Sequence, residues 1–146
     1  MTEVLIKRLS KNVELPKYET SGSSGMDLCA NIETKIKIGP GKTSIIPTGI
    51  SLSIPKNYEI QIRPRSGLAA KNQVSVLNTP GTIDADYRGE IKVILINLGS
   101  NTFTVKRGER IAQMVLTPVV KAKFKEVENL GETDRGSGGF GSTGLK

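Results

Sequence analysis

Turn-forming residues interrupt this chain at short intervals, and their spacing constrains the fold more than any other feature of the sequence. Glycine, proline or asparagine turns fall at residues 39–41, 55–57, 80–81, 99–101 and 107–109. Between these turns, no window of about 11 to 18 residues shows a clean helical period. Short strands joined by frequent turns are typical of β-barrels and β-sandwiches. The sequence therefore predicts an all-β fold, with one short helix after Ser66.

Two patterns of apolar residues predict two kinds of strand. Residues 34–38, 59–63 and 103–106 alternate apolar and polar side chains, as expected of strands with one solvated face. Residues 91–96 and 111–120 are more continuously apolar, as expected of strands covered on both faces. Half-buried and fully buried strands are therefore both expected.

The residue inventory excludes several kinds of chemistry. The chain has 146 residues, enough for one domain with its own core but not for a second catalytic domain. Cys29 is the only cysteine, and there is no histidine. Disulfides, Cys/His zinc sites and His-dependent triads are therefore excluded. A general base in this chain must be a carboxylate, a lysine or a tyrosine.

Charge and hydropathy favour a soluble protein with an anionic partner. The net charge is +7, but the basic residues are scattered, which argues against stable nucleic-acid binding. No stretch approaches the roughly 18 apolar residues of a membrane span, so we expect a cytoplasmic protein without membrane contact. Lys121, Lys123 and Lys125 recur with a period of two and predict the solvated face of a late strand.

The composition changes after Glu128, where glycine and polar residues replace the apolar runs. We therefore divide the chain into a β-domain, residues 1–128, and a mobile C-terminal tail, residues 129–146. A glycine-rich tail is usually just a solvated terminus. This tail also carries a cation, an aromatic ring and two hydroxyl groups, which suit closure over a nucleotide. These side chains are Arg135, Phe140, Ser142 and Thr143.

Residues 78–90 predict a hairpin loop built to hold a ligand. β-Branched residues flank this segment on both sides, and proline and glycine bracket its turns. In an extended segment, Asp84 and Asp86 project to one side and Tyr87 to the other. Taken alone, the segment is better described as an acidic β-turn whose aspartates cap their own backbone.

Three other segments carry polar side chains that suit an anionic substrate. Asp27 follows a glycine-rich turn, where its carboxylate either meets a hydrated metal ion or caps the turn. Residues 64–69 combine an arginine, a hydroxyl group and a glycine after a predicted strand, which suits either a phosphate cradle or a surface ion pair. Residues 107–113 lead into a predicted core strand. For Glu109 and Arg110, a simple hairpin turn without a role in binding is an alternative interpretation that stays open.

In order and spacing, these segments resemble the trimeric deoxyuridine triphosphatase (dUTPase, dUTP pyrophosphatase) family, from about Ser24 to Gly144. The motifs that carry the resemblance, most specific first, are residues 81–89, 64–69, 135–144, 25–28 and 108–113. The resemblance implies a jelly-roll-like β-barrel and a homotrimer in which each active site draws on three chains. It also implies hydrolysis of dUTP to dUMP and pyrophosphate, which limits uracil incorporation into DNA and supplies dUMP for dTTP synthesis.

The resemblance further implies roles for particular residues. Asp84 is the implied general base that activates a water for attack on the α-phosphorus, and Gln113 is implied to position that water or a nearby phosphate. Mg²⁺ is the implied cofactor, held mainly by the triphosphate and water, with Asp27 in its outer shell. Tyr87 is implied to exclude ribose, and Phe140 to cover the uracil. The implied substrate-binding set is Arg65, Ser66, Gly67, Asn78, Thr82, Ile83, Asp84, Tyr87, Lys92, Arg135, Phe140, Gly141, Ser142 and Thr143.

Two other functions stay open. A deoxycytidine triphosphate deaminase shares this fold and phosphate site but does different chemistry on the base, and the hairpin and tail match the hydrolase pattern better. A non-catalytic single-strand-binding barrel is compatible with the positive charge. However, three tyrosines, three phenylalanines and no tryptophan offer it few stacking platforms.

Overall fold

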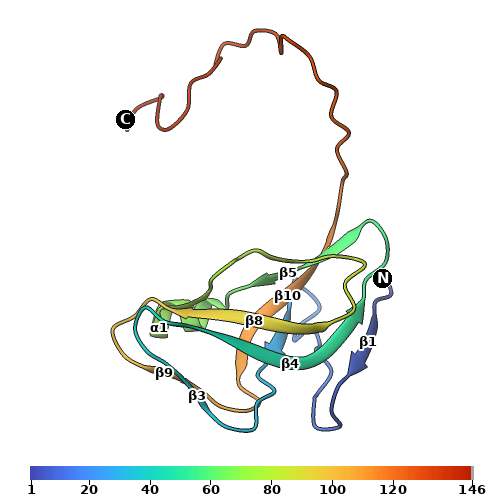
Figure 1. Ribbon diagram of the computed structural model, residues 1–146, viewed down its shortest axis with the longest axis vertical. Coiled ribbons are helices and arrows are strands. Elements are labelled where there is room, and N and C mark those ends of the chain that lie inside the picture. The colour runs from blue at the N-terminus through green and yellow to red at the C-terminus, as the bar shows by residue number, and fades with distance from the viewer. Residues whose placement is uncertain (146) are drawn as a thin grey trace.

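The computed structural model describes residues 1–145, which fold into antiparallel strands with a single short helix (Figure 1). In chain order the elements are β1 (Leu5–Arg8), β2 (Met26–Cys29), β3 (Ile36–Ile38), β4 (Thr43–Ser53), β5 (Tyr58–Arg63), α1 (Ser66–Asn72), β6 (Val74–Val76), β7 (Gly81–Ile83), β8 (Glu90–Asn97), β9 (Phe103–Val105) and β10 (Arg110–Pro118). The predicted all-β class and the helix that begins at Ser66 are confirmed. No helix within the described range is long and apolar enough to cross a membrane.

Two four-stranded sheets form the body of the molecule. One sheet has the strand order β1-β4-β8-β6 and the other β2-β10-β5-β7, while β3 and β9 form a small separate pair. Strands that are neighbours in a sheet are often distant in sequence, as β2 and β5 are from β10. The sheets therefore bring together polar motifs that lie far apart along the chain.

The core contains inward-facing aliphatic side chains of both sheets, together with buried residues outside them, such as Ile38 of β3 and Val105 of β9. Ile46 of β4 and Val93 of β8 are completely buried there. Strand β8 alternates, so that Ile94 and Ile96 point outward and are only half-buried, and β10 also has a partly exposed face. The prediction that residues 91–96 and 111–120 form strands covered on both faces is therefore wrong for the single chain.

The segment predicted as one hairpin in fact connects the two sheets. Strand β6 pairs with β8 in one sheet, but β7, which lies between them in sequence, pairs with β5 in the other. Strand β7 ends at Ile83, and a turn follows in which the Tyr87 N–H donates to the Asp84 carbonyl at 3.2 Å. The predicted strand-like alternation of Asp84, Asp86 and Tyr87 is therefore wrong, because these residues lie in a turn.

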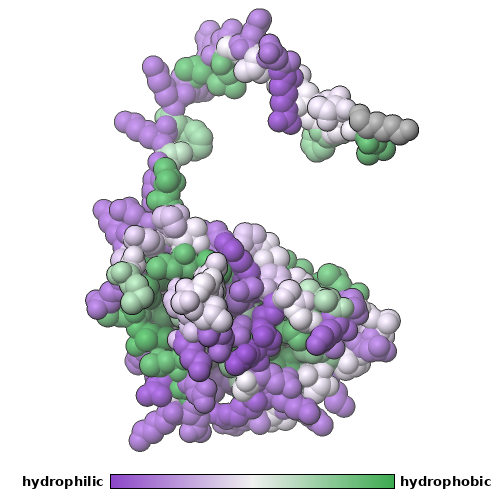
Figure 2. All heavy atoms as spheres, turned by 180° about the vertical axis from the view of Figure 1, so that it is seen from behind, coloured by the Kyte–Doolittle hydropathy of each residue, from purple (hydrophilic) through white to green (hydrophobic). Residues whose placement is uncertain are grey.

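The C-terminal segment leaves the body where β10 ends. The Val119 N–H donates to the Asn57 carbonyl at 2.8 Å, and the chain then arches away from both sheets (Figure 1). The late strand predicted at residues 121–125 is wrong, because this segment has no neighbouring strand with which to pair. The segment stands clear of the body (Figure 2). Phe124 within it is 95% exposed. The predicted tail ends at Lys146, which lies outside the described residues.

Candidate active site

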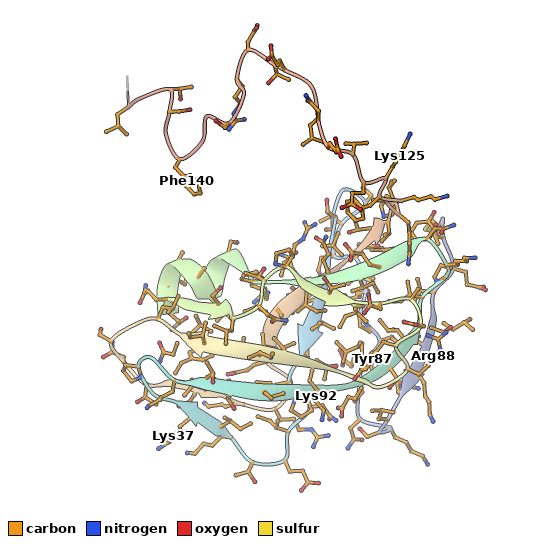
Figure 3. The ribbon with its side chains drawn as sticks, turned by 45° about the horizontal axis from the view of Figure 1, so that its top comes forward. Lys37, Tyr87, Arg88, Lys92, Lys125 and Phe140 are labelled. Atoms are coloured by element: carbon orange, nitrogen blue, oxygen red, sulfur yellow. The ribbon has the colours of Figure 1, made fainter. Side chains whose placement is uncertain are left out.

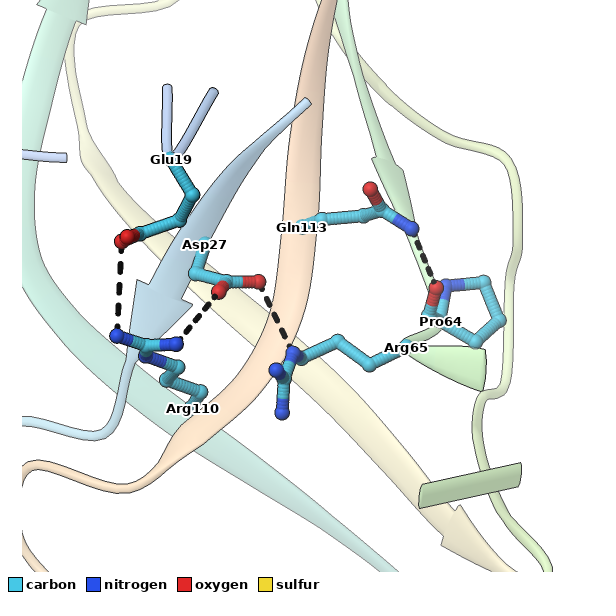
Figure 4. Close-up of polar contacts among 6 residues, drawn as sticks. All are labelled: Glu19, Asp27, Pro64, Arg65, Arg110 and Gln113. Atoms are coloured by element: carbon cyan, nitrogen blue, oxygen red, sulfur yellow. Dashed lines mark hydrogen bonds and ion pairs between the residues drawn. The ribbon is translucent and has the colours of Figure 1, made fainter. Parts of the chain in front are cut away.

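Three segments distant in sequence meet around the Asp27 carboxylate (Figure 4). Asp27 Oδ1 accepts a hydrogen bond from Arg65 Nε at 2.9 Å, and Asp27 Oδ2 lies 3.5 Å from Arg110 Nη1. Arg110 Nη2 also lies 3.5 Å from Glu19 Oε1. One carboxylate thus holds two guanidinium groups close together, and such a cluster suits a polyanion that takes over an arginine from its carboxylate partner.

Strand pairing explains why these side chains converge. Strand β10 lies between β2 and β5, so Gln113 sits opposite Asp27. A bulge just after Arg110 allows Arg110 and Gln113 both to face away from the core, although strict alternation would separate them. Gln113 Nε2 donates to the Pro64 carbonyl at 3.0 Å, which links β10 to the segment that carries Arg65 (Figure 4).

Helix α1 adds backbone donors beside this cluster. Arg65 is its N-cap residue, and Ser66 and Gly67 are its first two residues. No side chain caps this end, and no acidic residue lies in the first turn, so the first backbone N–H groups have no side-chain acceptor. The structure therefore brings five predicted site residues into one region: Asp27, Arg65, Ser66, Gly67 and Gln113.

The predicted hairpin residues gather at a separate cavity of about 300 Å³. Its lining is Thr82, Ile83, Asp84, Tyr87, Glu90 and Lys92. Asn78 lies next to the start of β7, since a Cβ at Gly81 would be 3.1 Å from Asn78 Nδ2. The lining shares no residue with the Asp27 cluster. In one chain, the residues of this cavity and the residues of the Asp27 cluster therefore lie at different places.

Asp84 lies exposed at the junction of two hollows. Besides the 300 Å³ cavity, it lines another of about 460 Å³, together with Asp86, Lys56 and Lys121. Its carboxylate is therefore open to water, as a base that activates water requires.

Hydrogen bonds from side chains to the backbone fix the loop that follows Asp84. Tyr87 Oη donates to the Glu90 carbonyl at 3.0 Å, which holds the ring beside the cavity. Arg88 Nη1 donates to the Ala85 carbonyl at 2.6 Å and to the Tyr87 carbonyl at 3.0 Å. Both hydrogen bonds of Arg88 go to carbonyl groups of the same loop. The loop is therefore held by contacts with its own backbone.

The tail carries its predicted site residues away from both groups. Phe140 lies on the arching tail, well apart from Tyr87 on the body (Figure 3). Arg135 Nε donates within the tail, to the Gly138 carbonyl at 2.9 Å. Residues 141–143 are exposed. A single chain therefore does not bring the predicted tail residues to the cluster or to the cavity.

Three residues of these regions have no role assigned from the sequence. For Arg110, the sequence left a simple hairpin turn as an alternative interpretation. In the structure, Arg110 pairs with Asp27 because a β-bulge turns its side chain outward, and the position of a bulge depends on the partner strand. Glu19 comes from a loop and reaches the cluster only through the fold. Glu90 lines the hairpin cavity, and its position two residues before Lys92, on the same face of β8, is a signal that could have found it.

Neither a reactive thiol nor a preformed metal cage lies in the described part of the chain. Desolvation raises the pKa of the Cys29 thiol, and the charge of the nearby Arg110 offsets this only in part, so the thiol stays protonated at neutral pH. Within residues 1–145, no three acidic, cysteine or histidine side chains are grouped to hold a metal ion. Any cation at this site therefore needs ligands from water or substrate.

The chain is thus an all-β protein in which the predicted site residues of the body lie in two separate groups. The dUTPase family profile matches residues 11–144. The chain is 57% identical over 137 residues to the deoxyuridine 5'-triphosphate nucleotidohydrolase of Brucella melitensis biotype 2, covering 92% of this chain and 87% of the relative. It is 57% identical over 146 residues to the protein of the same name from Rickettsia bellii, covering 99% and 97%. The chain belongs to the dUTPase family.

Solved structures of dUTPases share this fold. A mutant dUTPase of Staphylococcus bacteriophage 80alpha with dUpNHpp matches with a TM-score of 0.89 and 25% identity, covering 99% of this chain and 100% of that chain. A mutant dUTPase from phage phi11 of S. aureus, described with a structural Mg(II) ion, matches with a TM-score of 0.79 and 21% identity, covering 88% and 99%. The predicted jelly-roll-like β-fold is confirmed. These matches do not favour the deaminase or the single-strand-binding barrel.

Proposed function

We propose that this chain hydrolyses dUTP to dUMP and pyrophosphate. The observation that carries the proposal is one cavity that gathers Asp84 and Tyr87 with Thr82, Ile83 and Lys92. Membership of the dUTPase family, and relatives named deoxyuridine 5'-triphosphate nucleotidohydrolase, support the same reaction. In the cytoplasm, this reaction limits uracil incorporation into DNA and supplies dUMP for dTTP synthesis.

The reaction is a nucleophilic substitution at the α-phosphorus. A water oxygen bonds to that phosphorus, the bridging bond between the α-phosphorus and the leaving oxygen breaks, and pyrophosphate departs with the bonding electrons. Asp84 takes the proton of the attacking water, a role that suits an exposed carboxylate in a chain without histidine. Gln113 orients the water or the adjacent phosphate through its amide oxygen, since its Nε2 already donates to the Pro64 carbonyl.

The hairpin segment selects the base and the sugar. Backbone donors and acceptors between Asn78 and Lys92 imitate a pairing partner for uracil. Cytosine presents the opposite pattern and leaves buried groups unpaired, at roughly 1–3 kcal/mol for each group. Thymine is excluded because its methyl group has no room, and Tyr87 occupies the space of a ribose 2'-hydroxyl.

The triphosphate binds at the Asp27 cluster. Arg65 exchanges its bond to Asp27 for phosphate oxygens, to which a guanidinium group can donate two parallel hydrogen bonds. Ser66 and Gly67 supply backbone N–H groups from the uncapped start of α1. The cluster thus exchanges one anionic partner for another.

Mg²⁺ fits this site as a companion of the triphosphate. Protein sites for Mg²⁺ at nucleotides use one or two carboxylates, and water and phosphate oxygens provide the other ligands. Asp27 supplies such a carboxylate beside the phosphate-binding arginines and would contact the ion through water. When bound, the ion neutralises charge on the phosphate oxygens.

A homotrimer completes each site from three chains. In one chain the Asp27 cluster, the hairpin cavity and the tail lie apart, so each subunit would complete its neighbours' sites. Large aliphatic side chains are exposed on and beside the β1-β4-β8-β6 sheet: Ile45 (59% exposed), Leu77 and Leu98. Exposed aliphatic side chains gathered on one face suit burial against another subunit.

The tail, residues 129–146, closes over the bound nucleotide. Arg135 binds phosphate, Phe140 covers the uracil, and residues 141–143 donate to phosphate oxygens. Their exposure leaves them free to make these contacts, and the glycines around them permit close approach of backbone N–H groups to the ligand.

Product analysis tests the proposed function. The protein is incubated with Mg²⁺ and each deoxynucleoside triphosphate, and pyrophosphate and ammonia are measured. Pyrophosphate release from dUTP is expected, with far less from dCTP and dTTP. Ammonia release from dCTP would indicate a deaminase instead, and a lack of pyrophosphate from dUTP would overturn the proposal.

A further inference from the structure

Gly89 leaves just enough room for the Tyr87 ring. A Cβ at Gly89 would overlap Tyr87 Oη and would lie 2.5 Å from Cζ and 3.0 Å from Cε2. An aromatic ring cannot bend away from such a contact, so any side chain at position 89 would displace the whole ring. The ring therefore has its present orientation only because residue 89 is glycine.

Glu90 holds the other side of this arrangement. Its backbone carbonyl accepts the hydrogen bond from Tyr87 Oη at 3.0 Å. Its side-chain Oε1 accepts a hydrogen bond from the Gly49 N–H at 3.0 Å, across from β8 to β4. One residue thus contacts the tyrosine through its main chain and an adjacent strand through its carboxylate.

The attachment point on β4 is an irregularity in the strand. The register between β4 and β8 shifts within residues 47–51, opposite the start of β8. Gly49 has φ +73° there, a conformation that favours glycine, and its N–H is taken by the Glu90 carboxylate. The buried Thr48 hydroxyl donates to the Ile91 carbonyl and fixes the next residue of β8. The start of β8 is therefore anchored to the core at two successive residues.

We propose that Gly89 and Glu90 are positioning residues for Tyr87, and that the β4 irregularity sets sugar selectivity through them. The inference rests on the proposed function, in which Tyr87 excludes the ribose hydroxyl. Gly89 admits the ring, the Glu90 carbonyl fixes its hydroxyl group, and the Glu90 carboxylate ties that carbonyl to the core. Discrimination between deoxyribose and ribose then depends on a path that runs from β4 through β8 to the ring.

Substrate selectivity tests this path, measured as kcat/KM for dUTP divided by kcat/KM for UTP. Gly89→Ala is expected to lower the ratio about tenfold or more, since rejection of one added group by fit is worth about 10- to 200-fold. Glu90→Ala is expected to lower it severalfold. Glu90→Gln should restore it, because an amide oxygen still accepts the Gly49 N–H. Gly22→Ala is the matched control, since a Cβ there meets nothing within 4 Å, and it should leave the ratio unchanged.

A second measurement does not depend on hydrolysis. The chain has three tyrosines and no tryptophan, so ring-labelled tyrosine gives few NMR signals, and Tyr87→Phe identifies the one from Tyr87. Gly89→Ala and Glu90→Ala should shift this signal and leave those of Tyr18 and Tyr58 in place. An unmoved Tyr87 signal or an undiminished ratio in folded Glu90→Ala would overturn the inference. A shifted signal in a chain that does not hydrolyse dUTP would support the ring's positioning but overturn the proposed function and its link to sugar selectivity.

Discussion

The Asp27 cluster and the loop at residues 84–89 hold their functional groups in different ways. In the cluster, charged side chains on and next to strands pair with each other, as Asp27 does with Arg65. In the loop, side chains donate to backbone carbonyls, as Tyr87 does to Glu90. The cluster can therefore exchange partners while its strands stay in place, whereas the loop keeps one shape.

This difference predicts that the cluster mainly determines affinity for the ligand and the loop mainly determines selectivity between ligands. The side chains of Arg65 and Asp27 are 30% and 21% exposed, and solvent-screened pairs of this kind are typically worth up to about 1 kcal/mol. A bound polyanion can therefore take over Arg65 at modest cost. A loop with one backbone shape instead discriminates between similar ligands, because a poor match leaves its groups unpaired. Substitutions in the loop should thus alter turnover and selectivity, and those in the cluster should alter affinity and metal dependence.

The largest effect is expected from Asp84→Asn in the loop. The change removes the proposed proton acceptor but keeps size and hydrogen-bonding capacity, so kcat should fall by about 10²- to 10⁴-fold while dUTP binding persists. Single-turnover assays measure the chemical step, and calorimetry with a non-hydrolysable dUTP analogue measures binding. Asp86→Asn, in the same loop, is the comparison variant. A larger loss there than in Asp84→Asn would transfer the base assignment to Asp86.

Mixed trimers test whether the loop and the tail of one site come from different chains. Asp84→Asn and a chain truncated after Gly131 should each be nearly inactive. When both are unfolded and refolded together in equal amounts, a site works only if the truncated chain supplies Asp84 and the Asn chain supplies the tail. Random mixing in a closed ring gives that combination at roughly a quarter of the sites.

The recovered activity is measured against the unmodified protein refolded in the same way. Subunit exchange is verified independently, by native mass spectrometry of the mixed assembly. If activity stays absent despite exchange, the loop and the tail of a site belong to one chain, and the shared-site arrangement is wrong.

A smaller effect is expected from Tyr87→Ala, which tests the selectivity of the loop. Loss of the ring should raise kcat/KM for UTP relative to dUTP by about 10- to 100-fold, because the ring excludes one hydroxyl group by fit. Binding of dUTP should weaken less. The measurement is steady-state kinetics with both nucleotides, and equal losses for the two would mean that Tyr87 only packs.

The smallest effect is expected from Asp27→Asn in the cluster. The Mg²⁺ concentration for half-maximal activity should rise severalfold, because the outer-shell carboxylate is lost. The free energy of unfolding should fall by less than about 1 kcal/mol, since the broken ion pairs are partly exposed. Magnesium titration and thermal unfolding measure the two quantities. Glu19→Gln removes only the outer pair of Arg110, and an equal rise in the magnesium requirement there would contradict the metal role of Asp27.

Local patterns in the sequence were sufficient for much of the fold. Alternation at residues 59–63 predicted β5, and the segment around Ser66 predicted α1. These patterns succeed because side-chain period and turn chemistry act over a few residues. The motifs likewise identified Asp27, Arg65 and Gln113 in one place and Asp84, Tyr87 and Lys92 in the other, although their proposed roles stay predictions until the variants are measured.

Sequence alone thus determined the class of fold and the family, and it supplied the candidate site residues, because these depend on short-range patterns and motif spacing. Only the tertiary structure decided that β7 joins the opposite sheet, that a bulge turns Arg110 toward Asp27, and that Glu90 anchors the loop to β4. It also decided that residues 121–125 form no strand in the single chain. The physical reason is common to all four: backbone pairing, register and bulges depend on which distant segment becomes the neighbour, and a local period does not contain that information.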